Sequence, residues 1–196
     1  MKLEHNFIDK NDFELIELAK QDSEYFGILM SRYQEKLFWY VKRISYFTNE
    51  DIEDILQEVL IKAYRNLNEF DASFKFSSWI YRVTHNRVVD EIRKRKRQKE
   101  GLFDELKESD VEAFLRSSID LEQKTLSKDC FKKAREAIEK LPLKYREAMI
   151  LRFLEEKNYE EIMDILERPK GSVATLIARG KKILKRELKQ VRIDCL

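Results

Sequence analysis

Apolar side chains recur every three or four residues along most of the chain, and this spacing is typical of amphipathic helices. In the first half, the pattern predicts helices over residues 13–22, 25–44, 49–67 and 78–97. The periodicity weakens after these helices and returns near Lys128, where a second helical group begins. The pattern therefore predicts two groups of helices separated by a less regular segment.

The segment between the two groups has the composition of a linker. Residues 98–127 are acidic, include Gly101 and a pair of serines at 117 and 118, and show only weak periodicity. We therefore predict an all-α protein with two small helical domains, over residues 12–97 and 128–190, joined by this linker.

The composition agrees with helices and reveals an uneven distribution of charge. Only four glycines and two prolines occur among 196 residues, of which 39% are charged, and strands with tight turns would need more of both. The net charge is +2, yet residues 170–192 hold eight Lys or Arg and one Glu, and residues 93–97 read RKRKR. Residues 100–129 hold nine acidic and four basic side chains. Two basic patches separated by an acidic stretch suggest two contacts with a polyanion.

Several classes of function lack support in the sequence. No apolar run approaches the length of a membrane-spanning helix, and the first residues lack the apolar core of a signal peptide. Cys130, Cys195, His5 and His85 have no metal-ligand spacing, so we predict no metal or cofactor. There is neither a Gly-rich phosphate loop nor a nucleophile elbow. We therefore predict a protein that is not an enzyme, does not insert into a membrane and works in a reducing cytoplasm.

A helix-turn-helix is predicted toward the C-terminal end of the sequence. Asn158 and Glu161 have the spacing of a capping box at the start of a short helix. Pro169 and Gly171 then interrupt the chain before a long helix, whose apolar stripe leaves a basic face. In a helix-turn-helix, such a second helix enters the major groove of DNA. An ordinary pair of antiparallel helices is the alternative, and the basic face favours DNA.

Two segments resemble the extracytoplasmic-function (ECF) group of bacterial sigma factors, which belong to the sigma-70 family. Residues 51–97, DIEDILQEVLIKAYRNLNEFDASFKFSSWIYRVTHNRVVDEIRKRKR, are similar to region 2 of these proteins. Residues 158–188, NYEEIMDILERPKGSVATLIARGKKILKREL, are similar to region 4. Either motif alone is moderately specific, whereas the pair in this order is highly specific. The resemblance implies a protein that binds core RNA polymerase, directs it to promoter DNA and helps to open the duplex.

One face of the predicted helix over 49–67 is the candidate docking surface for core polymerase. Four of its residues recur at i, i+3, i+4 and i+7 and so share this face: Asp54, Gln57, Glu58 and Ile61. Three polar side chains around an apolar one suit a specific protein interface. The resemblance implies that this segment docks on the coiled coil of the largest polymerase subunit. Without the resemblance, a solvated acidic face explains the pattern about as well.

The candidate surface for the −10 element combines an aromatic loop with the helix that follows it. The resemblance implies that this loop and helix capture a flipped base, and aromatic faces stack on unpaired bases. The candidate residues are Phe70, Phe74, Phe76, Trp79, Arg82, Asn86 and Arg93. Burial in the core is the alternative for the aromatic members. We favour the core for Trp79 and at least one Phe, and DNA for Arg82 and Asn86.

The candidate surface for the −35 element is the basic face of the long C-terminal helix. Its members are Ser172, Thr175, Arg179, Lys181, Lys182 and Lys185. Related recognition helices often carry a basic residue, Ser and Arg where this one has Ala174, Thr175 and Leu176. Fewer long polar side chains allow fewer base contacts, so we expect recognition to depend on phosphates and DNA shape. Arg179 and Thr175 are expected nearest the bases.

Two other classes of function remain open. A helix-turn-helix regulator that binds DNA without polymerase would have no use for the region 2-like half. An interaction protein that has lost DNA binding would have no use for the two basic patches. The resemblance also implies an anti-sigma factor as a partner, because proteins of this family commonly have one. No residue of this sequence indicates such a partner by itself. Transcription with core polymerase would separate the three classes.

Overall fold

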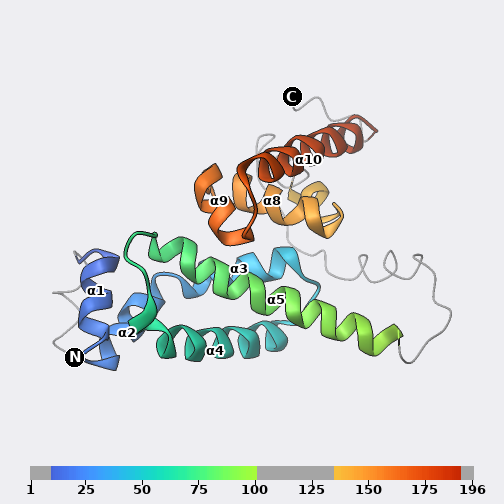
Figure 1. The fold of residues 1–196 in the computed structure, drawn as a ribbon. Coiled ribbons are helices and arrows are strands. Elements are labelled where there is room, and N and C mark those ends of the chain that lie inside the picture. Colours follow the sequence, from blue (N-terminus) through green and yellow to red (C-terminus); the bar gives the residue numbers. More distant parts are fainter. Residues whose placement is uncertain (1–9, 101–134, 191–196) are drawn as a thin grey trace, which may run out of the picture.

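The computed structural model describes residues 10–100 and 135–190, and the elements within these ranges are helices. The first range holds α1 (Asp12–Ala19), α2 (Ser23–Ser31), α3 (Gln34–Ile44), α4 (Asn49–Arg65), the 3-10 turn η2 (Leu67–Glu69) and α5 (Phe76–Glu100). The second range holds α8 (Leu143–Phe153), α9 (Tyr159–Leu166) and α10 (Lys170–Gln190). The all-α prediction is confirmed (Figure 1). Residues 101–127 of the predicted linker lie outside the described residues.

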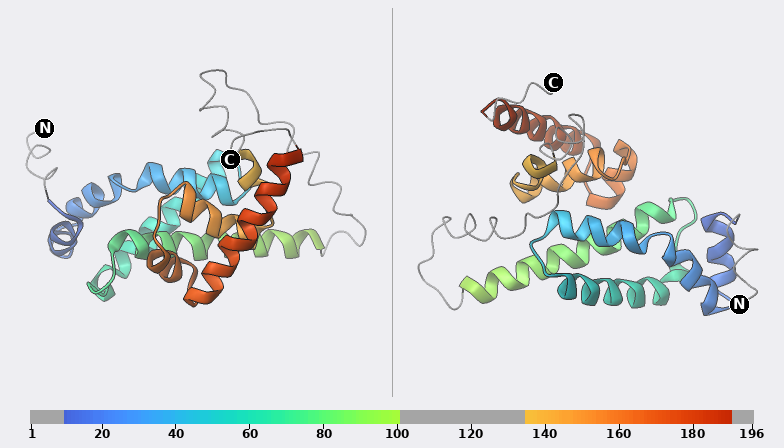
Figure 2. Two further views of the ribbon diagram at one scale, coloured as in Figure 1. Left: turned by 90° about the horizontal axis from the view of Figure 1, so that it is seen from above. Right: turned by 180° about the vertical axis from the view of Figure 1, so that it is seen from behind.

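The first range folds into a unit in which α3, α4 and α5 pack together, with α1 and α2 at one end (Figures 1 and 2). The apolar stripes of these helices bury side chains that are at most 1% exposed, among them Leu37, Tyr40, Ile52, Ile80 and Tyr81. Burying a side chain of this size stabilises the folded state by roughly 1.5–3 kcal/mol. These buried side chains fix the first part of the long helix α5 against α3 and α4.

The periodicity predicts one helix over 25–44, and this prediction is wrong, because the chain breaks between α2 and α3. The N–H groups of Arg32 and Tyr33 donate to carbonyls only three residues back, at Leu29 and Met30. The Arg32 guanidinium donates to Asp12 Oδ1 at 2.9 Å, and the Tyr33 hydroxyl donates to the same carboxylate. The break therefore directs two side chains to the start of α1 and holds that helix against the unit.

The second range folds around α8, α9 and α10. Val173 and Ile177 of α10 are buried together with Met149 of α8. The Asn158 side chain accepts a hydrogen bond from the Glu161 N–H at 2.9 Å, and the Glu161 carboxylate accepts one from the Asn158 N–H at 2.9 Å. The predicted capping box is therefore confirmed. It fixes the start of α9, the first helix of the helix-turn-helix.

The turn between α9 and α10 begins with an unusual backbone conformation. Glu167 follows α9 with φ at 51°, in the left-handed region that ends many helices. Its N–H donates to the Met163 carbonyl, so the last turn of α9 closes before the chain reverses. Pro169 precedes α10 and leaves its own carbonyl to accept from the N–H groups of Ser172 and Val173. These local features set the angle between the two helices.

The C-terminal unit lies on α3 and α5, on the side away from α4 (Figures 1 and 2). Within this arrangement α9 contacts α5, and α8 contacts α3. The buried side chains of both units belong to one hydrophobic cluster. The two predicted domains are therefore packed together as a closed molecule.

Candidate nucleic-acid interfaces

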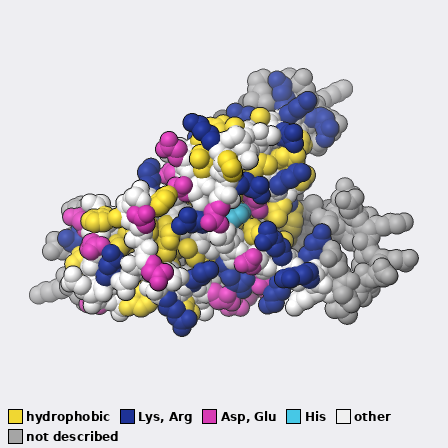
Figure 3. Space-filling model, viewed as in Figure 1, with side chains coloured by type: hydrophobic (Ala, Val, Ile, Leu, Met, Phe, Trp, Pro, Cys, Tyr) yellow, Lys and Arg dark blue, Asp and Glu magenta, His cyan; other side chains and the backbone are white. Residues whose placement is uncertain are grey.

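The basic face of α10 lies on the surface, as its sequence pattern predicts. All six candidate residues are exposed: Ser172, Thr175, Arg179, Lys181, Lys182 and Lys185. The opposite face of α10 is buried against α8 and α9. Helix α10 therefore presents one charged side to solvent along the C-terminal unit, where Figure 3 shows Lys and Arg side chains gathered.

Two of these side chains are engaged within the protein. The Thr175 hydroxyl donates to the Gly171 carbonyl at 2.8 Å, which leaves its methyl group for apolar contact. The Lys181 ammonium lies 5.1 Å from the ring centroid of Phe153, which places it against α8. Arg179 and Lys182 are the better candidates for direct contact with DNA, since both are exposed on α10.

The fold adds basic residues that the sequence pattern did not single out. A shallow hollow between α8 and the start of α10 is lined by Lys144 and Arg168 together with Ser172, Thr175 and Arg179. Lys144 lies on α8 and Arg168 in the turn, so only the folded chain brings them beside α10. Their charges enlarge the surface that could neutralise phosphates next to the recognition helix.

The aromatic loop before α5 is mostly part of the core. Phe70 is 9% exposed and Phe76 is 4% exposed, and their ring centroids lie 5.7 Å apart. Trp79 is half-buried, with its ring 5.5 Å from each of theirs. In this conformation Phe70 and Phe76 support the loop and are not accessible to a base. Phe74 is 42% exposed and is the member of the loop that could stack on one.

One polar candidate on α5, Asn86, contacts the C-terminal unit. Arg82 and Asn86 are both half-buried, and the Asn86 side-chain amide donates to Glu167 at 3.3 Å. Asn86 is therefore hydrogen-bonded to the turn before α10 when the molecule is closed.

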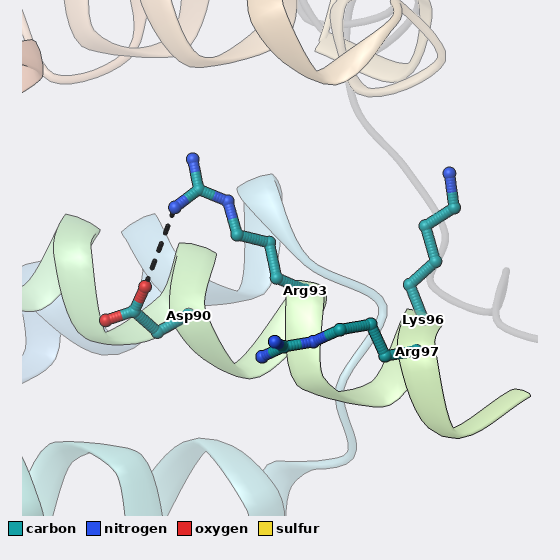
Figure 4. Close-up of a pocket in the computed structure, with 4 residues that line it drawn as sticks. All are labelled: Asp90, Arg93, Lys96 and Arg97. Atoms are coloured by element: carbon teal, nitrogen blue, oxygen red, sulfur yellow. Dashed lines mark ion pairs between the residues drawn. The ribbon is translucent and has the colours of Figure 1, made fainter. Parts of the chain in front are cut away.

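Four members of the RKRKR run, at the end of α5, differ in the direction of their side chains. Arg93, Lys96 and Arg97 surround a hollow that opens outward, with Arg93 3.7 Å from Asp90 (Figure 4). Arg95 instead turns inward. Its guanidinium donates two hydrogen bonds to Asp51, at 2.7 and 2.9 Å, and holds the pKa of that carboxyl well below its usual range. The first three residues are suited to phosphate contact, whereas Arg95 joins α5 to the start of α4.

The four candidate docking residues share the exposed face of α4: Asp54, Gln57, Glu58 and Ile61. Ile61 is 53% exposed, and Tyr64, one turn further on, is 45% exposed and extends the apolar part of this face. Glu58 is already paired, because Arg87 of α5 donates to its two oxygens at 2.5 and 3.2 Å. This pairing lowers the pKa of Glu58. Substitution of Asp54 therefore tests docking without breaking the pair between Glu58 and Arg87.

Three buried polar side chains lie where the two units meet: Tyr40, His85 and Glu147. The Tyr40 hydroxyl is 3.0 Å from His85 Nδ1, and burial lowers the pKa of His85 to about 4. Glu147 of α8 is 6% exposed, and burial raises its pKa to about 7 in spite of the guanidinium groups of Arg168 and Arg146. Ionisable side chains are rarely buried in this way unless a tertiary contact requires it.

Two further classes of site are not found in the part of the chain that the structure covers. Within residues 10–100 and 135–190, His, Cys, Asp and Glu side chains form no group able to hold a metal ion. In the same ranges, none of the helices has the length and apolar character needed to cross a membrane.

Comparison with known proteins identifies the family. Residues 29–98 match the model of Sigma-70 region 2, and residues 131–184 match that of Sigma-70, region 4. The ECF RNA polymerase sigma factor SigW of Bacillus subtilis is 32% identical over 191 residues, which cover 89% of this chain and 95% of SigW. The ECF RNA polymerase sigma-E factor of Haemophilus influenzae is 31% identical over 181 residues, which cover 90% of this chain and 95% of that protein.

Two solved structures share the fold. The structure of CnrH in complex with the cytosolic domain of CnrY has a TM-score of 0.64 at 18% identity, over 91% of this chain and 97% of that one. RpoE from Bartonella quintana, in complex with the anti-sigma factor NepR, has a TM-score of 0.64 at 20% identity, over 86% of this chain and 98% of that one.

The chain therefore belongs to the sigma-70 family, and the relatives that match most of its length place it in the ECF group. As a sigma factor, it binds core RNA polymerase, directs it to promoters and assists promoter opening for transcription initiation. The prediction of this function from the paired region 2 and region 4 motifs is confirmed.

Proposed function

We propose that the two units divide promoter recognition between them. Residues 12–97 dock on core polymerase through α4 and take up the opened −10 strand on α5, whereas residues 128–190 bind the −35 duplex through α10. The single observation that supports this division is the presence of two separate basic surfaces, one at the end of α5 and one on α10. Residues 98–127 connect the two units along the chain.

We further propose that the protein contributes no catalytic chemistry of its own and acts in the cytoplasm, where core polymerase is found. An anti-sigma factor is the proposed regulatory partner. Two proteins that share the fold are seen in complexes: CnrH with the cytosolic domain of CnrY, and the Bartonella RpoE with the anti-sigma factor NepR. To test for this partner, the tagged chain is purified from its own cells. A small protein that co-purifies with it in fractions that lack core polymerase would be the proposed anti-sigma factor.

Arg179→Ala is expected to reduce discrimination for the −35 element. A lost bidentate base contact costs about 1–3 kcal/mol, so discrimination by holoenzyme between its own promoter and one with a scrambled −35 sequence should fall by roughly 5- to 150-fold. Lys182→Ala is the matched control on the same exposed face. It should weaken binding to both sequences equally and make the salt dependence less steep, because it contacts phosphate. Equal effects of the two substitutions on both promoters would contradict the role of Arg179.

Asn86→Ala is expected to reduce open complex while closed-complex formation stays nearly unchanged. Its amide can donate to and accept from a base edge, and the loss of such a contact costs about 1–3 kcal/mol, or roughly 5- to 150-fold in the equilibrium constant for opening. Permanganate reactivity of unpaired thymines measures the open complex. A template with a pre-melted −10 bubble removes most of the unpairing cost and should restore the variant in part.

The stability of the variant provides the control for this experiment. Asn86 is half-buried, and its side chain donates an exposed hydrogen bond to Glu167 of the other unit, so its truncation should leave the unfolding midpoint within about one or two degrees of the parent value. A large fall in the midpoint, with normal promoter opening at low temperature, would make Asn86 a structural residue. Phe74 and the rest of the loop would then have to hold the strand.

A further inference from the structure

A continuous network of ion pairs connects α4 to the last turns of α5. It consists of Asp51 and Glu58 of α4 together with Arg87, Glu91 and Arg95 of α5. Glu91 is at its centre, because it accepts from Arg87 Nη1 and from Arg95 Nε, each at 3.0 Å, and its side chain is 10% exposed. Arg87 extends the network to Glu58, and Arg95 extends it to Asp51. We call this set of five side chains the arginine network.

Arg95 has partners on three sides. Its Nη1 and Nη2 groups donate to the two oxygens of Asp51 at 2.9 and 2.7 Å, and its Nε donates to Glu91 at 3.0 Å. Its guanidinium carbon lies 4.4 Å from the ring centroid of Phe47, in the loop before α4. Bidentate hydrogen bonds to a carboxylate are strong and directional. Three of the five guanidinium N–H groups are therefore used within the protein, and the side chain is fixed in one orientation.

Asp51 is in turn fixed by the start of α4. Its Oδ2 accepts from the Thr48 N–H at 3.2 Å, and the Thr48 hydroxyl accepts from the Asp51 N–H at 3.2 Å. This capping box sets the first turn of α4 and the direction of the Asp51 carboxylate. Arg95 is therefore paired with a group that is itself held in place at the end of a helix.

The part of α5 that Arg95 holds has no apolar packing of its own. Val88 is fully buried and Ile92 is half-buried, and no apolar residue follows Ile92 in the helix. The described side chains at 93–98 are exposed, with the exception of Arg95. The last turns of α5 extend beyond α3 and α4 (Figures 1 and 2). Arg95 therefore supplies a contact with the rest of the unit after the apolar core has ended.

The basic side chains on the other side of this helix end are Arg93, Lys96 and Arg97, which we call the outward basic set. They lie around the hollow shown in Figure 4. Each residue of an α-helix turns the chain by about 100°, so Arg95 lies about 160° around α5 from Arg93 and from Arg97. The rotation of α5 that brings Arg95 to Asp51 therefore turns Arg93 and Arg97 away from α4.

We propose that Arg95 is a positioning residue for promoter DNA. Through its ion pairs it fixes the rotation and the place of the end of α5, so that the outward basic set is held ready for phosphates. The proposal rests on the proposed function of this end of α5. Arg95 itself does not contact the DNA. A basic surface that is already ordered loses less conformational freedom on binding than the same charges on a loose helix end, so it binds more tightly.

Asp51→Asn distinguishes positioning from simple electrostatics, because the two predict changes of opposite sign. The substitution removes a negative charge and keeps an acceptor for the Thr48 N–H, so charge alone would make DNA binding tighter. Positioning predicts weaker binding. Holoenzyme with Asp51→Asn should bind a double-stranded fragment of a promoter that it transcribes about three- to tenfold more weakly, because a smaller fraction of molecules has the end of α5 in place.

Asp90→Asn is the matched control for this experiment. It makes the same charge change on α5 itself, beside the outward basic set, at a side chain that is 71% exposed and outside the arginine network. The Asp90→Asn holoenzyme should bind the fragment as tightly as the parent or slightly more tightly. Circular dichroism and association with core polymerase should match the parent for both variants. Binding by Asp51→Asn that is as tight as binding by Asp90→Asn would overturn the proposal.

Arg95→Lys tests the other partner of the pair without changing any charge. A lysine cannot donate the bidentate pair to Asp51, so binding should weaken by a similar factor. The slope of log affinity against log salt concentration should stay as in the parent, because no phosphate contact is lost. A parent-like affinity of Arg95→Lys would contradict positioning by the guanidinium fork.

A triple variant tests whether Arg95 acts through the outward basic set. Arg93→Ala, Lys96→Ala and Arg97→Ala together remove the side chains that are positioned, so adding Arg95→Lys should cause no further loss of affinity. A further loss of the same size as in the parent background would overturn the proposal, because Arg95 would then have a general structural role. Failure of the proposed function would appear separately, as a triple variant that binds the promoter fragment as the parent does.

Discussion

Asp54→Lys should weaken association with core polymerase by roughly 30-fold or more, because a like charge placed against a charged partner surface costs several kcal/mol. Asp54 is exposed on α4. Its reversal breaks no hydrogen bond between side chains of the described residues, unlike reversal of Glu58, which would break the pair with Arg87. Surface plasmon resonance with immobilised core enzyme measures the loss, and promoter-dependent transcription should fall with it.

Glu53→Lys is the matched control for this experiment. It makes the same charge change at the adjacent position, which lies about a quarter turn around α4 from Asp54, at the edge of the docking face beside Gln57. The Glu53→Lys protein should retain affinity within a few-fold of the parent. If Asp54→Lys binds core polymerase as the parent does, or if both variants lose affinity equally, the face that we assign to docking is wrong.

Gly180→Leu should destabilise the helix-turn-helix unit by about 1–3 kcal/mol, the usual effect of forcing extra atoms into a packed core. A Cβ at Gly180 would lie 2.7 Å from Met149 Cγ and 2.9 Å from its sulfur. Met149 is 1% exposed and has little room to move away. Chemical denaturation followed by circular dichroism should show earlier loss of the C-terminal helices, and −35 binding should fail at temperatures the parent tolerates.

Two further variants identify packing as the cause. Gly27→Ala in α2 meets no atom within 4 Å, so it should stabilise the protein by roughly 0.5–1 kcal/mol through helix propensity alone. Combining Gly180→Leu with Met149→Ala should cost less than the sum of the two single changes, because each relieves the crowding or the cavity made by the other. Strict additivity, or a Gly180→Leu protein as stable as the parent, would contradict the close approach of α8 and α10.

The parts of the fold that the sequence predicts correctly are those set by neighbours along the chain. The capping box of Asn158 with Glu161 spans three residues, and the break at Pro169 depends on the backbone of that residue itself. The apolar stripe of α10 follows from helical periodicity, and Val173 and Ile177 are buried as it requires. Each of these features has its physical cause within one or two helical turns.

The features that the sequence did not predict depend on residues far apart in the chain. The break after α2 is held by Asp12, about twenty positions before Tyr33. Arg95 belongs to a run whose positions circle the helix, so not every member can contact phosphate, but only the fold shows that Arg95 turns inward to Asp51, 44 positions earlier. Glu155 gives no local sign that it will meet Arg43, 112 positions away. Periodicity identifies the face of a helix but not the partner that will cover it.

The same limit applies to the aromatic loop. Phe70, Phe74 and Phe76 are one residue type within seven positions, and no local rule ranks their exposure. Their burial is decided by Tyr33, whose ring lies 5.5 Å from that of Phe76 in an edge-to-face arrangement, and by Trp79. The sequence therefore predicts an aromatic loop at the correct place, and the fold selects Phe74 as the ring that remains accessible.

Helix α4 faces solvent on the side of the molecule opposite to the C-terminal unit. The packing of the two units therefore leaves the face that we propose for docking accessible to polymerase. The basic face of α10 is exposed in the same arrangement, so the proposed docking face and the proposed −35 surface are both accessible before the two units move relative to each other.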